Sequence, residues 1–257
     1  MKLAVNKFTQ ALKNSEKQIG LWLSLRNNFA AEVVSPSGYD WLLIDMEHNP
    51  NDVSTVLTQL QAVDSGGSTA LVRPPWNDTV MIKRLLDIGA PGLLIPMVQS
   101  VEEAEKAVAA TRYPPRGVRG VTGTSRGNAF GRIKDYYDRV EDETTLLIQL
   151  ETRSAIEQAI PIASVDGVSG VFFGPADIAA DIGKLGQPLC DEVWELIMPA
   201  AKSLMEKGIP VGTLVGDPDF AARLLKEGFT FVAVGSDLSI LISGADNLLA
   251  NVKAKMG

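Results

Sequence analysis

The sequence lacks the marks of several protein classes. Its single cysteine, Cys190, cannot form a disulfide within the chain, which suits the reducing cytoplasm where we expect the protein to act. Acidic residues outnumber basic ones by 31 to 24, so the basic excess typical of nucleic-acid binding is missing. No stretch reaches the ~18 consecutive apolar residues of a membrane span, and the first residues contain no long apolar signal segment. We therefore expect neither nucleic acid nor membrane as a partner.

Histidine is equally scarce, because His48 is the only one in 257 residues. It lies in the stretch WLLIDMEHNP (41–50), where an apolar run ends in Asp45, Glu47 and His48. Imidazole is the one side chain whose ordinary pKa lies near neutral pH. Its position beside two carboxylates, at the end of a predicted buried strand, makes this stretch the first candidate for a functional site.

Eight short apolar runs recur along the chain, separated by segments with helical periodicity. Several runs are apolar at nearly every position, as is typical of parallel strands buried on both faces. Eight strand–helix units predict a (β/α)₈ barrel, an α/β fold, as one domain over residues 1–257. A doubly wound open sheet is the alternative, although no G-x-G-x-x-G follows the first run. The runs are 19–25, 41–46, 69–74, 92–98, 145–151, 170–175, 209–215 and 229–235.

Other features place helix boundaries and one long loop. Polar residues predict four helix N-caps and glycines predict three left-handed helix ends. These are Asp52, Asp78, Ser100 and Asp217, and Gly89, Gly208 and Gly228. The stretch 112–132, rich in Gly, Pro and Arg, is predicted to be a functional loop. A last helix is predicted near the C-terminus, and its apolar face either covers the barrel or packs on a partner. That face comprises Leu238, Ile240, Leu241, Leu248 and Leu249.

Two carboxylates stand where barrel enzymes carry their chemistry, at the C-terminal ends of the strands. Glu151 ends the fifth run and Asp177 follows the sixth, so the two could converge from neighbouring strands. A carboxylate pair without another strong ligand indicates a hard divalent cation, Mg²⁺ or Mn²⁺, with Co²⁺ as a further option. The alternative is that both are structural carboxylates at helix N-termini.

Three further residues are candidates for the same rim or its surroundings. Arg73 ends the third run, where it could hold a carboxylate or stabilise an enolate; a salt bridge to Asp45 or Glu47 is the alternative. His48 is predicted to be a general base, against the alternative of a structural histidine. Asp87 lies in an apolar helical segment. Its carboxylate is either capped and structural or held to interact with a partner.

Three competing signals are weak. GTSRG (123–127) fits G-x-S-x-G but lies in the irregular loop rather than at a strand-to-helix elbow. No lysine falls within a predicted strand, so a Schiff-base aldolase would lack its nucleophile. VAVGSD, after the eighth run, has too few glycines to indicate a phosphate site.

Several segments together resemble one known family along almost the whole chain. The most specific are DWLLIDMEH and VFFGPADI, and the others include RPPWND, LLDIGAPGLLIPMVQS, RYPPRGVRGV and QLETRSA. The chain resembles the metal-dependent pyruvate aldolases of the HpcH/HpaI aldolase family. That resemblance implies an enzyme that reversibly cleaves a 4-hydroxy-2-oxo acid, from aromatic or sugar-acid catabolism, to pyruvate and an aldehyde.

The resemblance also implies roles for individual residues. Glu151 and Asp177 would ligate the metal, and Arg73 would stabilise the enolate of pyruvate. His48 would be the general base, with Asp87 raising its basicity.

Substrate contacts are implied as well. Gln149, Ala176 and Asp177 would contact pyruvate, partly through backbone N–H groups. Trp22, in the first run, and Leu214, at the end of the seventh, are the remaining candidates for contact with substrate.

The pairing of Asp87 with His48 conflicts with a single barrel. The helix that follows Arg73 carries Asp87 away from the mouth at ~1.5 Å per residue, so the contact is expected to form between neighbouring subunits. The family's habit then implies a homo-oligomer, a hexamer. The competing functions are a CoA-ester lyase of the citrate-lyase-β kind, for which no basic cluster is visible, and a non-catalytic barrel that binds a 2-oxo acid.

Overall fold

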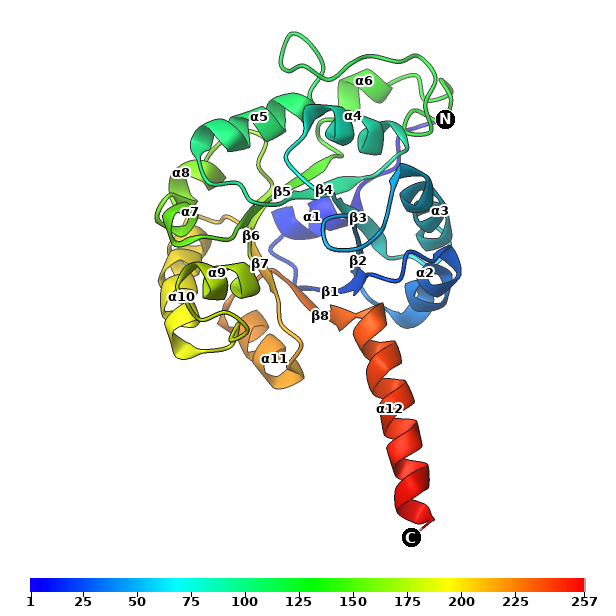
Figure 1. Ribbon diagram of the computed structural model, residues 1–257. Coiled ribbons are helices and arrows are strands. Elements are labelled where there is room, and N and C mark those ends of the chain that lie inside the picture. Colours follow the sequence, from blue (N-terminus) through cyan, green and yellow to red (C-terminus); the bar gives the residue numbers. More distant parts are fainter. Residues whose placement is uncertain (257) are drawn as a thin grey trace.

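The fold is a closed barrel of eight parallel strands that pair in sequence order from β1 to β8, with β8 returning to β1 (Figure 1). This computed structural model describes residues 1–256. The predicted (β/α)₈ barrel is confirmed, and the alternative of an open doubly wound sheet was wrong. The strands are β1 Gln18–Leu23, β2 Trp41–Asp45, β3 Thr69–Arg73, β4 Gly92–Ile95, β5 Thr145–Leu150, β6 Gly170–Phe173, β7 Val211–Leu214 and β8 Phe231–Ser236.

Helices surround the barrel and connect its strands (Figure 1). They are α1 Lys7–Lys13, α2 Asn28–Val34, η1 Ser35–Ser37, α3 Val53–Val63, α4 Thr79–Asp87, α5 Val101–Thr111, α6 Tyr136–Arg139, α7 Arg153–Glu157, α8 Ala159–Ala163, α9 Pro175–Asp181, α10 Asp191–Glu206, α11 Pro218–Glu227 and α12 Asp237–Lys255. All four predicted N-cap side chains accept a backbone N–H, and all three predicted glycines have positive φ. The local signals in the sequence therefore placed these boundaries correctly.

Strand β2 shows why the strands are apolar at every position. Trp41 and Leu43 belong to the cluster inside the barrel, whereas Leu42 and Ile44 belong to the cluster between barrel and helices. All four are buried, because successive side chains of a strand point to opposite faces and both faces are covered here.

Helix α1 closes the end of the barrel opposite the carboxyl ends of the strands. Phe8 packs against Trp41 and Phe231 inside the barrel, with ring centroids 5.7 and 5.8 Å apart. Figure 1 shows α1 in the middle of the ring of strands. Because this aromatic plug fills one end, access to the barrel interior is left to the other end.

The predicted long loop is confirmed as irregular backbone. No helix or strand occurs between α5 and α6, and Figure 1 shows this stretch looping beyond α4 and α5, away from the middle of the barrel. Arg119 within it is fully buried and lies 4.6 Å above the ring of Tyr113. The loop is therefore anchored by a buried cation rather than by secondary structure.

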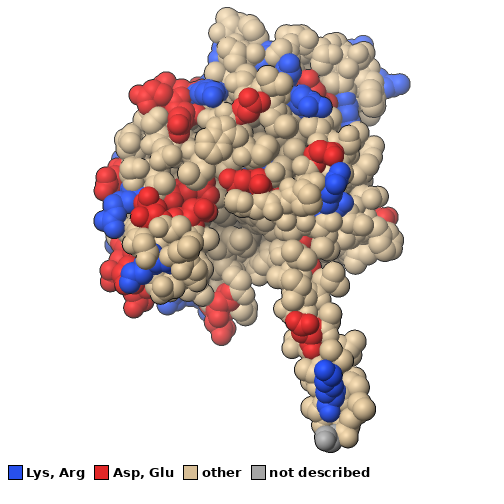
Figure 2. Space-filling model, in the orientation of Figure 1, with Lys and Arg blue, Asp and Glu red and all other residues tan. Residues whose placement is uncertain are grey.

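Helix α12 projects away from the barrel (Figures 1 and 2). Its first residue, Asp237, is buried and accepts the Ser24 backbone N–H at 2.7 Å, but residues 238–256 are exposed. The helix therefore does not cover its own barrel, which leaves packing on a partner as the remaining prediction. Its exposed large apolar side chains are Leu238, Ile240, Leu241, Ile242, Leu248, Leu249 and Val252.

Within residues 1–256, no helix has both the length and the apolar character needed to cross a membrane.

The close contact between β1 and β2 yields a stability prediction. A Cβ added at Gly20 would lie 2.1 Å from Cε2 of the buried Trp41, so Gly20→Ala should lower the free energy of unfolding by about 1–3 kcal/mol. The control is Gly123→Ala, where a Cβ meets nothing within 4 Å and which should change that free energy by less than about 1 kcal/mol. Urea unfolding measures both, and equal stabilities would contradict the packing described.

Candidate active site

A pocket of about 500 Å³ opens at the carboxyl ends of the strands. Figure 2 shows the corresponding hollow near the centre of the face. A larger cavity, about 660 Å³, lies beside the N-terminal segment and the long loop, but none of the side chains at the strand ends lines it. The lining residues of the first pocket are Trp22, His48, Arg73, Gln149, Phe172, Gly174, Pro175, Ala176, Asp177, Pro188, Leu189, Leu214, Val215, Gly216 and Asp217.

Arg73 is held at the end of β3 by two carboxylates. Its Nε donates to Asp45 Oδ1 at 2.8 Å, and its Nη1 forms an ion pair with Glu47 Oε2 at 2.7 Å. Burial opposes the charge, but the hydrogen bond to Asp45 and the charges of Asp45, Glu47 and Glu151 outweigh it and raise the pKa of Arg73. The guanidinium is therefore a fixed positive charge, 5.6 Å from the ring of Trp22.

The loop after β2 carries His48, and Asp45 fixes its path. Asp45 is 1% exposed and accepts from the Glu47 backbone N–H at 3.1 Å and from the Asn49 side chain. The Asn51 amide donates to the Asp45 carbonyl at 2.7 Å, which draws the end of the loop back to the strand. One carboxylate thus orients both Arg73 and the loop beside it.

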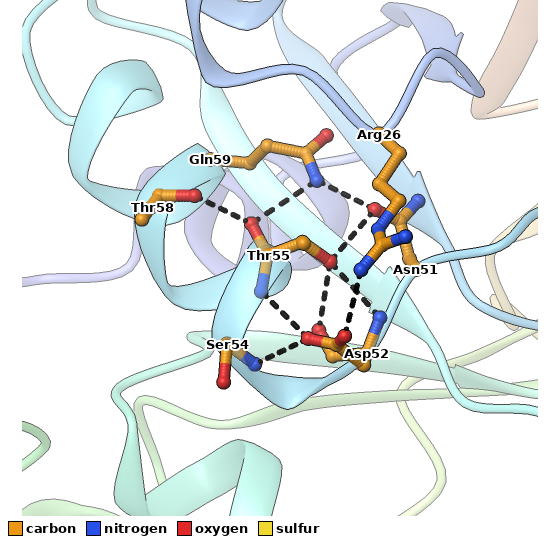
Figure 3. A network of polar contacts seen from close by, with 7 residues as sticks. All are labelled: Arg26, Asn51, Asp52, Ser54, Thr55, Thr58 and Gln59. Atoms are coloured by element: carbon orange, nitrogen blue, oxygen red, sulfur yellow. Dashed lines mark hydrogen bonds and ion pairs between the residues drawn. The ribbon is translucent and has the colours of Figure 1, made fainter.

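The far end of this loop is fixed to α3 (Figure 3). Asn51 Oδ1 accepts from the buried Gln59 side chain at 2.8 Å and from Thr55 Oγ1 at 3.1 Å. Asp52 caps the helix in a capping box with Thr55, and Arg26 donates to Asp52 at 2.9 Å. The network ties the loop to a helix and to the segment after β1, so the backbone around His48 is preorganised.

His48 itself reaches the pocket with little support from its own chain. Its side chain is 64% exposed, and its Nε2 lies 3.7 Å from Glu47 Oε2, beyond hydrogen-bonding distance. Burial raises the pKa of Glu47, although the charges of Arg73 and His48 oppose that rise. No hydrogen bond to the imidazole is formed within residues 1–256.

Glu151 follows β5 directly and is almost completely buried. Its Oε1 accepts from Gln149 Nε2 and its Oε2 from the Met97 backbone N–H, both at 2.6 Å. Burial raises the pKa of Glu151 to about 8, because the charges of Glu47 and Asp177 add to the effect and the Met97 hydrogen bond only partly offsets it. Carboxyl groups are thus crowded at this rim, and in the metal-free chain Glu151 keeps its proton near neutral pH.

Asp177 lies in the first turn of α9, immediately after β6; it lines the pocket and is close enough to Glu151 to raise the pKa of that carboxyl. The approach depends on Gly174, where a Cβ would lie 2.9 Å from Glu151 Cγ. Within residues 1–256 no cluster of three or more His, Cys, Asp or Glu side chains forms a ready metal site. Two neighbouring carboxyl groups nevertheless fit a hard divalent cation, whose charge would favour the ionised form of Glu151 against the burial that raises its pKa.

The predicted substrate contacts also gather here. Trp22, Gln149, Ala176 and Leu214 all line the pocket with Asp177. Gln149 has its Oε1 buried without a hydrogen-bond partner, so this amide has an acceptor to spare. The structure thus brings Asp177 and these four residues together in one pocket. Their contacts with substrate stay predictions.

Asp87 is the one predicted site residue that lies elsewhere. It ends α4 rather than lying inside that helix, and its Oδ1 accepts from Arg119 Nη2 at 3.0 Å. Asp87 and His48 make no contact with each other in the chain as described, residues 1–256. Arg119, which is fully buried, also donates to Tyr136 Oη at 3.2 Å, so Asp87 accepts from a guanidinium that a second hydrogen bond holds in place.

Sequence reasoning missed residues supplied by loops. Five pocket residues were missed. Phe172 is a strand residue of β6. The other four come from connections: Pro188 and Leu189 precede α10, and Val215 and Asp217 follow β7. Phe172 could have been found from the alternation of its strand. The loop residues carry no comparable signal, because the path of a connection decides which of its side chains face the mouth.

Glu151 predicts a pH dependence of stability in metal-free protein. Its pKa of about 8 in the folded chain exceeds the ordinary 4.5, so the folded state retains a proton that the unfolded state loses between these values. This contribution is complete below about pH 4.5 and lost as pH rises through about 8. Urea unfolding with EDTA should therefore show stability falling over that range, and Glu151→Gln should flatten the fall. Exposed Glu157→Gln is the control, and an unaltered slope in Glu151→Gln would contradict the assignment.

Comparisons with known proteins agree with this geometry. The chain is 50% identical over 250 residues to a pyruvate aldolase from Rhizobium etli, covering 97% of this chain and 98% of the relative. It is 49% identical over 251 residues to the 4-hydroxy-2-oxo-heptane-1,7-dioate aldolase of Salmonella dublin, covering 97% and 95%. A solved HpcH/HpaI aldolase/citrate lyase family structure from Burkholderia cenocepacia superposes with a TM-score of 0.93 at 35% identity, over 97% of this chain and 100% of that one. Residues 18–244 match the family model, and the chain belongs to the HpcH/HpaI aldolase/citrate lyase family.

Proposed function

We propose that this aldolase-family lyase reversibly cleaves a 4-hydroxy-2-oxo acid to pyruvate and an aldehyde. The observation that carries the proposal is the buried cation Arg73, which shares one pocket with Asp177 and lies near enough to the buried Glu151 for that carboxylate to raise the pKa of Arg73. The names of the two curated relatives, a pyruvate aldolase and a 4-hydroxy-2-oxo-heptane-1,7-dioate aldolase, support it. They favour an aldolase over the CoA-ester lyase and the non-catalytic barrel.

The cleavage needs a base at one end of the breaking bond and an electron sink at the other. His48 takes the proton from the C4 hydroxyl, the C3–C4 bond breaks, and the C4 fragment leaves as an aldehyde. The bonding electrons pass to the C2 carbonyl, where Arg73 holds the enolate oxygen. A proton returned to C3 then completes pyruvate. Gln149 and the backbone at Ala176 orient the pyruvate part.

Glu151 and Asp177 are the residues that would hold a divalent cation, Mg²⁺ or Mn²⁺. Such an ion supplies a Lewis acid for the carbonyl oxygen. The chain's part is to keep the two carboxylates together in a buried rim, with Gln149 and the Met97 N–H fixing Glu151. We place the enzyme in the cytoplasm, in the breakdown of aromatic compounds or sugar acids, and the lone Cys190 is consistent with that compartment.

Enolisation of pyruvate tests the metal and Arg73 without an aldehyde. The protein should exchange the methyl protons of pyruvate into D₂O, lose that activity in EDTA and regain it with Mg²⁺ or Mn²⁺. Glu151→Gln should lose tight metal binding in calorimetry, and Arg73→Ala should lose the exchange. Glu157→Gln, an exposed change, is the matched control for the glutamate. Full exchange by metal-free protein would refute this part of the proposal.

We further propose that the active enzyme is a homo-oligomer, a hexamer. Asp87 ends α4 next to the segment that enters β4, whereas His48 lies at the opposite end of the barrel, after β2. A neighbouring subunit can bring the two together where one chain does not. The exposed apolar residues along α12 provide a surface that association would bury, over a helix about 28 Å long.

Mixed oligomers test the shared site. His48→Ala alone should lower kcat by about two orders of magnitude or more, the scale of general-base loss, with metal affinity retained. Asp87→Ala should also be impaired. Mixing the two inactive variants should restore part of the activity, because some sites then combine an intact His48 with an intact Asp87. Each variant reassembled with itself is the control, and a fully active monomer in sedimentation would overturn the arrangement.

A further inference from the structure

One carboxylate oxygen lies between the two residues to which the proposed function gives opposite tasks. Glu47 Oε2 is 2.7 Å from Arg73 Nη1 and 3.7 Å from His48 Nε2. Arg73 would hold the enolate oxygen, and His48 would take the proton of the C4 hydroxyl. Both residues line the pocket, whereas Glu47 lies behind them. Glu47 is therefore placed to act on the reaction through its two neighbours.

Glu47 Oε2 still has the capacity to accept a hydrogen bond. Its contact with Arg73 is an ion pair, and within residues 1–256 this oxygen accepts no hydrogen bond. Atoms of its own chain already bury it, so a neighbouring subunit does not reach it. His48 is 64% exposed, which leaves its ring free to turn. A movement of roughly 1 Å would bring Nε2 within hydrogen-bonding distance of Oε2.

The proposed cleavage changes the charges on both sides of this oxygen. Before the reaction, the guanidinium of Arg73 faces the carboxylates of Asp45 and Glu47. Cleavage adds a negative charge beside Arg73, on the enolate oxygen, and a positive charge on His48, which has taken the proton. Glu47 then shares Arg73 with the enolate at the moment when a new cation forms next to Oε2. A charge-assisted hydrogen bond from His48 to Glu47 is favourable at that point.

The charged groups around Glu47 act in two directions. Burial is the largest effect on its pKa and raises it, and the charges of Asp45 and Asp177 add to that rise. The charges of Arg73 and His48 lower the pKa of Glu47 and so favour its carboxylate form. Because such coupling is reciprocal, the carboxylate of Glu47 in turn stabilises the protonated imidazole of His48.

We infer that Glu47 is a positioning residue for the general base, whose Oε2 accepts the Nε2–H of His48 once the imidazole has taken the substrate proton. The proton stays on His48, and Glu47 forms no bond to substrate. This inference rests on the proposed function and gives its base a partner within the same chain. Asp87 of a neighbouring subunit would supply a second carboxylate from outside. Glu47 thus stabilises the imidazolium while Arg73 holds the enolate.

Glu47→Gln tests the inference, because glutamine keeps the shape of the side chain and an acceptor oxygen but lacks the charge. The assay is pyruvate release by the metal-loaded oligomer from 4-hydroxy-2-oxo-heptane-1,7-dioate, the acid in the name of one relative. We expect kcat to fall about tenfold while KM stays within about twofold, since the lost interaction forms only as the proton is taken up. The exposed change Glu157→Gln is the matched control and should keep both wild-type values.

The pH dependence of kcat/KM separates a charge effect from a displaced loop. The acid limb of this profile reports protonation of the essential base in the free enzyme. The carboxylate of Glu47 favours the protonated base, so its removal should move the acid limb to lower pH by about 0.5–1, the Coulomb effect of one charge at 3.7 Å in a solvent-exposed setting. A loop displaced by the substitution would lower the rate without moving this limb. An unmoved acid limb in Glu47→Gln would overturn the inference.

A double-mutant cycle separates action through His48 from action through Arg73. In the His48→Ala background, Glu47→Gln should change the residual kcat by less than about twofold, because the imidazole that it supports is gone. An equal loss in both backgrounds would overturn the inference and leave the aldolase proposal standing, since Glu47 would then act through Arg73. Wild-type enzyme that neither cleaves the dioate nor exchanges the methyl protons of pyruvate would reject the proposed function and the inference with it.

Discussion

The ion pair between Arg73 and Asp45 is the interaction on which the site depends. Asp45 and Arg73 are register partners at the ends of β2 and β3, so the barrel itself sets the two charges side by side. Removing either would leave a buried charge without its partner, which costs far more than the pair contributes. The same carboxylate accepts from the Glu47 backbone N–H and from Asn49. The Asp45 carboxylate therefore links the register of β2 and β3 to the orientation of the Arg73 guanidinium and to the path of the loop that carries His48.

The two ends of the barrel differ: one end is packed with aromatic side chains, and the other carries the charged residues of the site. The aromatic plug of Phe8, Trp41 and Phe231 fills the end closed by α1, and the charged side chains gather at the opposite end. Glu151 shows the consequence, because the burial that stabilises the barrel also raises the pKa of that carboxyl. A cation that fits such a site offsets an electrostatic cost already present in the folded chain, as expected when functional sites are built at some expense of stability.

The sequence predicts what periodicity and position along a strand determine. Eight apolar runs led to the barrel, and residues at strand ends, such as Arg73 and Glu151, were found because the ends of parallel strands meet at one edge. Leu189 and the cap Asp217 were not found as pocket residues, since only the course of a connection brings them to the mouth. Asp87 shows another limit, because the chain contains no signal for a contact made outside itself, and its pairing with Arg119 appears only in three dimensions.

The closure of the barrel has a consequence for biosynthesis. β1 pairs with β8, so the barrel can close only after residues 231–236 have been synthesised and can pair with residues 18–23. Contacts of such long sequence separation form slowly, and until they form the edges of β1 and the growing sheet are open to pairing with other chains. On a ribosome, the early strands therefore emerge long before their last partner. Until β8 is made, the edges of the partial sheet stay unpaired in the nascent chain, and α12 is the next element to appear.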